Sequence, residues 1–187
     1  MTRIVYNTAT SLNGFIADEE NSLDWLFAVE SGEAPDHDAF MREVGVIVEG
    51  ATTYEWVLDS TKLLEHPDKW SSFFGDHPTF VFTSRDLPIP EGADVRLVSG
   101  DVEQHLDDIV RAASGLDVWL VGGGELVGQF YDIGALDEIQ VSIAPTALTG
   151  GAPLFPRDTD PGDLELTEVK RYGGFAHLCY TVHPASD

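Results

Sequence analysis

Short apolar runs alternate with segments of helical spacing along the first two thirds of the chain. Residues 101–113 place valine, leucine and isoleucine at the spacing of one helix face. The runs between such segments are too short for helices and rich in β-branched and aromatic residues. The predicted strands are residues 3–10, 46–48, 79–83, 95–98 and 118–121. This alternation predicts an α/β fold around a mostly parallel sheet.

The pattern changes after Gly134, where three further strand-like runs follow without helices between them. These runs, residues 139–143, 164–171 and 176–182, lack the crossover helices that parallel strands need, so this edge is expected to be antiparallel. A length of 187 residues suits one large domain. We therefore predict a single α/β domain over residues 1–187, with a twisted mixed sheet and an antiparallel C-terminal edge.

Two predicted helices begin at residues that suit an N-cap. Asp36 or Asp38 could cap a helix that runs to about Val44. Thr52 or Thr53 could cap the helix that follows the strand at residues 46–48. In both places a short polar side chain stands directly before or inside the first helical turn, where it can accept a backbone N–H.

Two longer segments carry weaker signals. Residues 11–35 contain several turn-forming residues and are expected to be mostly loop, with a short turn near residues 23–29. Residues 59–78 are polar and irregular, and Trp70, Phe73 and Phe74 are their expected apolar anchors.

The chain is strongly acidic, with 33 acidic and 10 basic residues and a net charge of −23. This balance argues against binding nucleic acid or an anionic membrane through a basic surface. The N-terminus enters a strand-like run without the apolar stretch of a signal peptide, so we expect a cytoplasmic protein. An anionic ligand would need local donors that overcome the repulsive field.

Cysteine and histidine give little sign of a metal centre. Cys179 is the only cysteine, which excludes an internal disulfide and a cysteine-rich zinc site, and its apolar surroundings predict a buried, inert thiol. The six histidines show no metal-ligand spacing, so no metal is expected. His177, in a predicted strand, is the one histidine that calls for inspection in the structure.

The most informative motif is the turn formed by Gly122, Gly123 and Gly124. A buried strand delivers the chain to these glycines, and a helix over residues 125–132 follows. Unpaired N–H groups at a helix start suit a phosphate. The motif is not the Rossmann fingerprint, because its sixth position is Val127 instead of glycine. A phosphate site and a plain tight turn both fit this motif.

Two other strand ends present small or hydroxyl-bearing residues. One is the segment over residues 49–55, and the other is Thr83-Ser84-Arg85, where a guanidinium beside two hydroxyls could bind a phosphate. Helix capping and a solvated arginine explain each motif separately. Together, however, three strand ends with donors match the edge of an open α/β sheet at which ligands bind.

The order of the motifs makes the chain recognisable. It reads S-L-N-G-F-I-A, G-A-T-T-Y-E, T-S-R, V-G-G-G and D-E-I-Q-V-S-I-A-P, followed by G-G-A-P-L-F. This order resembles the dihydrofolate-reductase-like superfamily, and most closely the C-terminal reductase domain of bifunctional riboflavin biosynthesis enzymes, the RibD C-terminal domain, in stand-alone form. The resemblance extends from Arg3 to about Val182. It implies a three-layer α/β/α fold, a homodimer, and an NADPH-dependent reductase of pterin, folate or aminopyrimidine compounds, with NADH as a possible substitute.

The resemblance also implies roles for particular residues. The implied cofactor-binding residues are Ala9, Ile16, Ala17, Gly50, Ala51, Thr52, Thr53, Thr83, Ser84, Arg85, Val121, Gly122, Gly123, Gly124, Glu125, Leu126 and Val127. The implied substrate-binding residues are Asn13, Trp25, Phe40 and Ser142. Asp36 is the implied proton donor, with Asp38 as the neighbouring candidate, and a helix N-cap explains Asp36 equally well.

Three positions depart from the family pattern. Ala51 replaces a usual arginine or lysine and removes a cation from the cofactor site. Asn13 stands where many relatives have aspartate, and Glu125 places a carboxylate near the pyrophosphate unless its side chain points away. These changes keep open the alternatives of a non-catalytic dinucleotide-binding or regulatory module and of a domain without a ligand.

Overall fold

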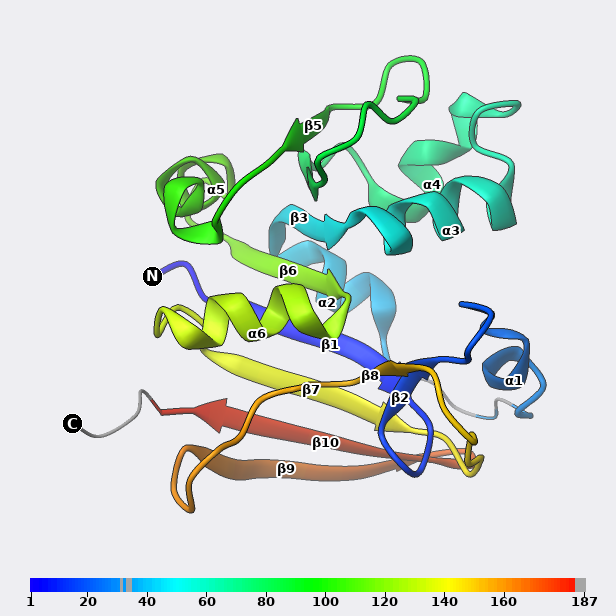
Figure 1. The fold of residues 1–187 in the computed structure, drawn as a ribbon, viewed down its shortest axis with the longest axis vertical. Coiled ribbons are helices and arrows are strands. Elements are labelled where there is room, and N and C mark those ends of the chain that lie inside the picture. Colours follow the sequence, from blue (N-terminus) through cyan, green and yellow to red (C-terminus); the bar gives the residue numbers. More distant parts are fainter. Residues whose placement is uncertain (31, 33–34, 184–187) are drawn as a thin grey trace.

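Eight strands form one mixed sheet in the order β5-β4-β3-β6-β1-β7-β10-β9 (Figure 1). The computed structural model describes residues 1–30, 32 and 35–183. The strands of this sheet are β1 (Ile4–Thr10), β3 (Val44–Gly50), β4 (Thr79–Phe82), β5 (Val95–Val98), β6 (Asp117–Gly122), β7 (Glu138–Ile143), β9 (Leu164–Tyr172) and β10 (Phe175–Val182). A small separate pair joins β2 (Phe15–Ala17) to β8 (Ala152–Pro153).

The strands from β5 through β7 are parallel, and β7, β10 and β9 pair in an antiparallel arrangement. This arrangement confirms the predicted mostly parallel sheet with an antiparallel C-terminal edge. Only a tight turn connects β9 to β10, and a turn permits only antiparallel pairing, so these two strands run in opposite directions.

Helices cover both faces of the sheet and make three layers, as predicted. The helices are α1 (Asp24–Phe27), α2 (His37–Glu43), α3 (Ala51–Thr61), α4 (Trp70–Phe74), α5 (Leu106–Ala112) and α6 (Gly124–Asp132), with 3-10 turns η1 (Pro67–Lys69) and η2 (Val102–Gln104). In Figure 1, α6 lies in front of the strands and α2 behind them. None of the helices in the described ranges combines the length and apolarity that crossing a bilayer requires.

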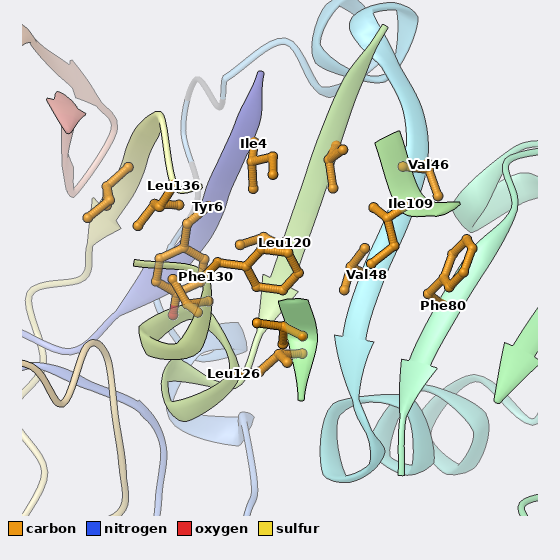
Figure 2. Close-up of a cluster of buried hydrophobic side chains, with 14 of the residues drawn as sticks. Ile4, Tyr6, Val46, Val48, Phe80, Ile109, Leu120, Leu126, Phe130 and Leu136 are labelled. Atoms are coloured by element: carbon orange, nitrogen blue, oxygen red, sulfur yellow. The ribbon is translucent and has the colours of Figure 1, made fainter. Parts of the chain in front are cut away.

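Residues of β3, β4, β5 and β6 enter two separate cores, one on each face of the sheet. On one face, Val46, Val48 and Leu120 meet Ile109 of α5 and Phe130 of α6 (Figure 2). On the other face, residues such as Ile47 and Val81 pack under α3 and α4. Because both faces of the central strands are buried, their sequences read as continuous apolar runs.

The structure corrects three local predictions. Gly50 is the N-cap of α3 and no side chain caps this helix, so Thr52 and Thr53 lie in its first turn instead of before it. Residues 59–78 contain α4, and Phe73 is exposed although Trp70 and Phe74 are buried as expected. The short strands β2 and β8 were not predicted, because their pairing joins segments more than 130 residues apart.

Candidate functional site

A cavity of about 770 Å³ opens at the carboxyl ends of the parallel strands. Its volume lies within the range of small-molecule sites. Residues from β2, the β3–α3 and β6–α6 connections, and the segments after β4 and β5 surround it. The lining residues are Thr8, Ile16, Ala17, Asn21, Leu23, Gly50, Ala51, Thr52, Thr53, Trp56, Val57, Phe82, Thr83, Ser84, Ser99, Gly100, Val121, Gly123, Gly124, Glu125, Leu126, Gln129, Ala152, Pro153 and Pro156.

Two helix N-termini face this cavity. Both α3 and α6 begin directly after a parallel strand, with Gly50 and Gly123 as their N-caps. Neither cap offers a side-chain hydrogen bond. The first N–H groups of each helix therefore lack a cap from the chain and can donate to an anion, with the positive end of each helix dipole behind them.

The three glycines of the β6–α6 turn serve different purposes. Gly122 has a φ of +140°, a conformation that side chains rarely adopt, and its peptide bond to Gly123 is cis. A Cβ on Gly124 would lie 2.4 Å from the carbonyl oxygens of Pro153 and Leu154. Gly124 is thus required by the packing of α6 against β8, whereas a Cβ on Gly123 would meet only Ile16 Cδ1, at 4.0 Å.

The cavity contains little charge of its own. Among the described residues that line it, Glu125 is the only charged side chain, and none is lysine or arginine. Arg157 donates two hydrogen bonds of 2.9 Å to the Glu125 carboxylate, and it also binds Asp132 at 2.9 Å. The hydrogen bonds from Arg157 lower the pKa of Glu125. The glutamate that the sequence placed near a phosphate is therefore paired with a cation.

Arg85 lies at the edge of this site but does not line the cavity. Its guanidinium donates to both carboxylate oxygens of Glu55 on α3, at 2.8 and 2.6 Å. The backbone N–H of Arg85 donates to Thr83 Oγ1 at 2.9 Å, which holds the turn after β4. A bidentate pair of this kind must open before Arg85 can bind another anion.

Most of the predicted cofactor residues meet at the cavity. Thirteen of the seventeen are in its lining, and the other four are Ala9, Arg85, Gly122 and Val127. Val127 is fully buried in the core beneath α6, and Gly122 lies beside the cavity next to Ile16 and Thr53. The helix at residues 124–132 thus contributes only its first turn and Gln129 to the wall.

The predicted substrate residues lie apart from the cavity. Asn13 forms hydrogen bonds with the backbone of Leu148, and Ser142 forms one with the ring of His177. Phe40 packs edge-on against Trp119, with ring centroids 5.4 Å apart. Trp25 Nε1 is buried and has no partner among the described residues.

Asp36, the implied proton donor, accepts the N–H of Ala39 at 2.9 Å and caps α2. This contact confirms the predicted capping role of Asp36. The side chain of Asp36 does not line the cavity, so the structure gives no direct path from its carboxyl group to a ligand there.

Sequence reasoning missed Trp56, which lines the cavity from α3. Its ring stacks on Phe27 of α1, with centroids 6.1 Å apart. Trp56 follows Thr52 and Thr53 by four and three residues, and side chains at these spacings share a helix face. This spacing was the available signal.

Glu49, the residue before Gly50, is the most unusual buried group. Its side chain has no exposure, and neither carboxyl oxygen has a hydrogen-bond partner among the described residues. Burial raises the pKa of Glu49 to about 8, so the carboxyl is mostly protonated at neutral pH. The nearby Tyr54 is also buried and donates to Pro88 O at 2.8 Å.

The prediction that the Cys179 thiol is buried is confirmed. Cys179 is buried, and burial raises its pKa to about 11, so the thiol is protonated at neutral pH. His177 on the same strand is also buried, which lowers its pKa. Both side chains lie on β10, away from the cavity lining.

Comparison with known proteins agrees with this geometry. The family model of the RibD C-terminal domain matches residues 2–178. The chain belongs to this family. YwjB of Bacillus subtilis, described as uncharacterized, is 31% identical over 178 residues and covers 95% of this chain and 97% of its own. YyaP of the same organism, also uncharacterized, is 25% identical over 182 residues, with 95% and 94% covered.

Solved structures of RibD-like proteins share the fold. A putative riboflavin biosynthesis protein from Shewanella sp. PV-4 is 26% identical, with a TM-score of 0.78 and coverage of 98% of this chain and 99% of that one. A pyrimidine reductase-like protein from Corynebacterium diphtheriae is 16% identical, with a TM-score of 0.65 and coverage of 97% and 92%. At that identity the second match bears on the fold alone. The predicted family and fold are thereby confirmed.

Proposed function

We propose that the protein is a reductase that binds NADPH or NADH in the cavity and passes hydride to a small heterocycle of the pterin, folate or aminopyrimidine type. The observation that carries this proposal is the pair of helix N-termini, both without a side-chain cap, at one cavity. A pyrophosphate is a group of the right charge for two such ends. Membership in the RibD C-terminal domain family supports the reductase chemistry.

The hydrogen-bond donors along the described cavity wall can bind a dinucleotide without a lysine or arginine among them. The hydroxyls of Thr52, Thr53, Thr83 and Ser84 add to the backbone N–H groups along the wall. Arg85 is held by Glu55, so a 2′-phosphate must compete with that carboxylate for the guanidinium. We therefore expect a weaker preference for NADPH over NADH than a free arginine would give.

The chain's own contribution is binding and orientation. A bound nicotinamide dinucleotide supplies the hydride. Ile16, Ala17 and Val121 offer an apolar wall against which a flat ring can rest, and exclusion of water there favours hydride transfer to a C=N or C=O carbon. Because Asp36 does not line the cavity, proton delivery from it requires a bridging water or an approach of α2.

A second function, dinucleotide binding without turnover, is favoured by one observation. Glu125 is the only titratable side chain among the described lining residues, and its carboxylate is bound to Arg157. In this alternative the cavity binds the nucleotide, but none of the described side chains that line it supplies the proton that a reduction needs.

Binding is tested by titrating the protein with NADPH and with NADH while following its tryptophan fluorescence, to which Trp56 at the cavity wall contributes. We expect both nucleotides to quench the fluorescence, and we expect Trp56→Phe to lose most of this quenching.

Thr52→Asp places a carboxylate in the first turn of α3, where it suits the helix dipole but repels a pyrophosphate. We expect its nucleotide affinity to fall about tenfold or more without loss of thermal stability.

Thr52→Asn is the matched control, because it has the same shape without the charge, and its affinity should stay near that of the wild type. Equal affinities of the Asp and Asn variants would contradict a phosphate at this helix end.

Oxidation of NADPH in the presence of pterins, folates and aminopyrimidine riboside phosphates separates the two functions. Binding without oxidation by any of these compounds would favour the non-catalytic alternative.

A further inference from the structure

A second group of reactive side chains lies on the antiparallel part of the sheet. Glu168 of β9 and His177 and Cys179 of β10 place one possible ligand atom each within 4.8 Å of one another. Cys179 Sγ is 3.5 Å from His177 Nε2 and 3.9 Å from Glu168 Oε1. None of the three lines the cavity, and the reductase proposal does not use them.

The register of the strands brings these side chains together. His177 and Cys179 are two residues apart on β10, so their side chains share one face of the sheet. Tyr180 pairs with Leu166, but its neighbour Cys179 pairs with Glu168, because a bulge interrupts the register between them. Without the bulge, Thr167 would stand opposite Cys179. The bulge therefore puts a carboxylate where a hydroxyl would be.

Neighbouring groups orient two of the three side chains. His177 Nδ1 lies 3.0 Å from Ser142 Oγ on β7. In the tautomer that donates Nδ1–H to Ser142, the lone pair of Nε2 faces Cys179 Sγ. Lys170 binds the second oxygen of Glu168, Oε2, at 2.7 Å and leaves Oε1 toward the thiol. Ser142 thus positions His177, and Lys170 positions Glu168. Lys170 pairs with His177 in the strand register, so its ammonium lies beside the cluster, and an ion that binds there must outcompete it for Glu168.

We propose that Glu168, His177 and Cys179 form a binding site for a divalent ion of the zinc class, with an open fourth position. In a tetrahedral site with Zn–S of about 2.3 Å and Zn–N of about 2.0 Å, the sulfur and nitrogen lie about 3.5 Å apart. The observed distance between Sγ and Nε2 is 3.5 Å, so the side chains need little movement. A thiolate, an imidazole and a carboxylate are all ligands that zinc accepts.

Charge and access also favour a cation here. The chain carries a net charge of −23, which attracts cations to its surface. His177 and Cys179 are buried, but the Glu168 side chain is 39% exposed and gives an ion a way in from solvent. The mixed ligand set excludes a site for calcium or magnesium, since these ions prefer oxygen ligands alone.

The test is titration of the chelator-treated, reduced full chain with Co²⁺, followed by its absorption spectrum. We expect a thiolate-to-cobalt charge-transfer band in the near ultraviolet that saturates at one ion per chain and disappears when Zn²⁺ is added. Cys179→Ser should remove the band, and Glu168→Gln should weaken binding by about tenfold or more. Ser142→Ala, which removes only the partner of His177, should weaken it by about tenfold.

His183→Gln is the matched control, because His183 directly follows β10, pairs with Glu165 of β9 and lies outside the cluster. Its binding should equal that of the wild type. Cobalt that binds without the thiolate band, as ions on surface carboxylates do, would overturn the proposal. So would a band that persists in Cys179→Ser. The wild-type spectrum alone decides the question if a variant fails to fold, and nucleotide binding is not part of the readout.

Discussion

Two strand-to-helix connections border the cavity, and each has a glutamate beside its glycines. On the β3–α3 side, Glu49 precedes Gly50 and is buried without a partner. On the β6–α6 side, Glu125 follows Gly124 and is paired with Arg157. Burial raises the pKa of Glu49, whereas hydrogen bonds from Arg157 lower that of Glu125. Negative charge is thus removed from one side by a proton and from the other by a cation.

The largest expected effect comes from Glu49. Its ordinary pKa is 4.5, and the folded state raises it to about 8, so between these values the unfolded chain releases a proton that the folded chain keeps. The free energy of unfolding must therefore fall as the pH rises from about 4.5 to 8. The difference in free energy of unfolding between Glu49→Met and the wild type should therefore shift in favour of the variant between pH 5 and pH 8. We expect this shift to be about 3 kcal/mol.

Urea denaturation at a series of pH values measures this difference. Glu103→Gln, at an exposed position of η2, is the control, and it should keep the slope of the wild type. If Glu49→Met shows the same pH slope as the wild type, the buried carboxyl does not hold its proton as described. The β3–α3 connection would then not lose its negative charge through a proton on Glu49.

A smaller effect is expected on the β6–α6 side. Arg157→Gln leaves Glu125 and Asp132 without their shared cation, so the carboxylate at the cavity wall is no longer neutralised. We expect nucleotide affinity in the fluorescence titration to fall about threefold to tenfold. Arg111→Gln, which removes one exposed positive charge on α5, is the matched control and should leave affinity unchanged. A similar loss in both variants would point to net charge instead of the Glu125 pair.

The smallest effect concerns the choice between nucleotides. Glu55→Gln weakens the pair that holds Arg85 and frees the guanidinium for a 2′-phosphate. We expect affinity for NADPH to rise about threefold while affinity for NADH changes little. Glu103→Gln makes the same change in net charge away from the site and should alter neither. An equal rise for both nucleotides in Glu55→Gln would show that Arg85 does not reach the 2′-position.

The fold was predictable because its signals are local. Apolar runs that end in glycine, such as the one before Gly122, mark the parallel strands and the cavity edge in the sequence itself. The capping role of Asp36 was equally local, since its partner Ala39 is three residues away. Each of these features depends on residues within one strand end or one helical turn.

The partners of the charged groups could not be predicted in the same way. Arg157 reaches Glu125 across 32 residues, and Glu55 reaches Arg85 across 30. The ladder between β9 and β10 was expected, but the bulge that sets Glu168 opposite Cys179 has no glycine to mark it. The burial of Glu49 could be read from the sequence, because Glu49 ends an apolar run that forms a central strand. A carboxyl group in such a strand is expected to be buried.

The absence of lysine and arginine from the described cavity lining has a consequence for how the protein would respond to salt. An approaching nucleotide anion is repelled at long range by 33 acidic residues and held at short range by N–H and hydroxyl donors. Dissolved ions shorten the reach of the repulsion, from about 10 Å at 0.1 M to about 3 Å at 1 M, and affect short hydrogen bonds far less. Concentrated electrolyte should therefore promote anion uptake in this molecule, the reverse of what it does at an arginine-lined site.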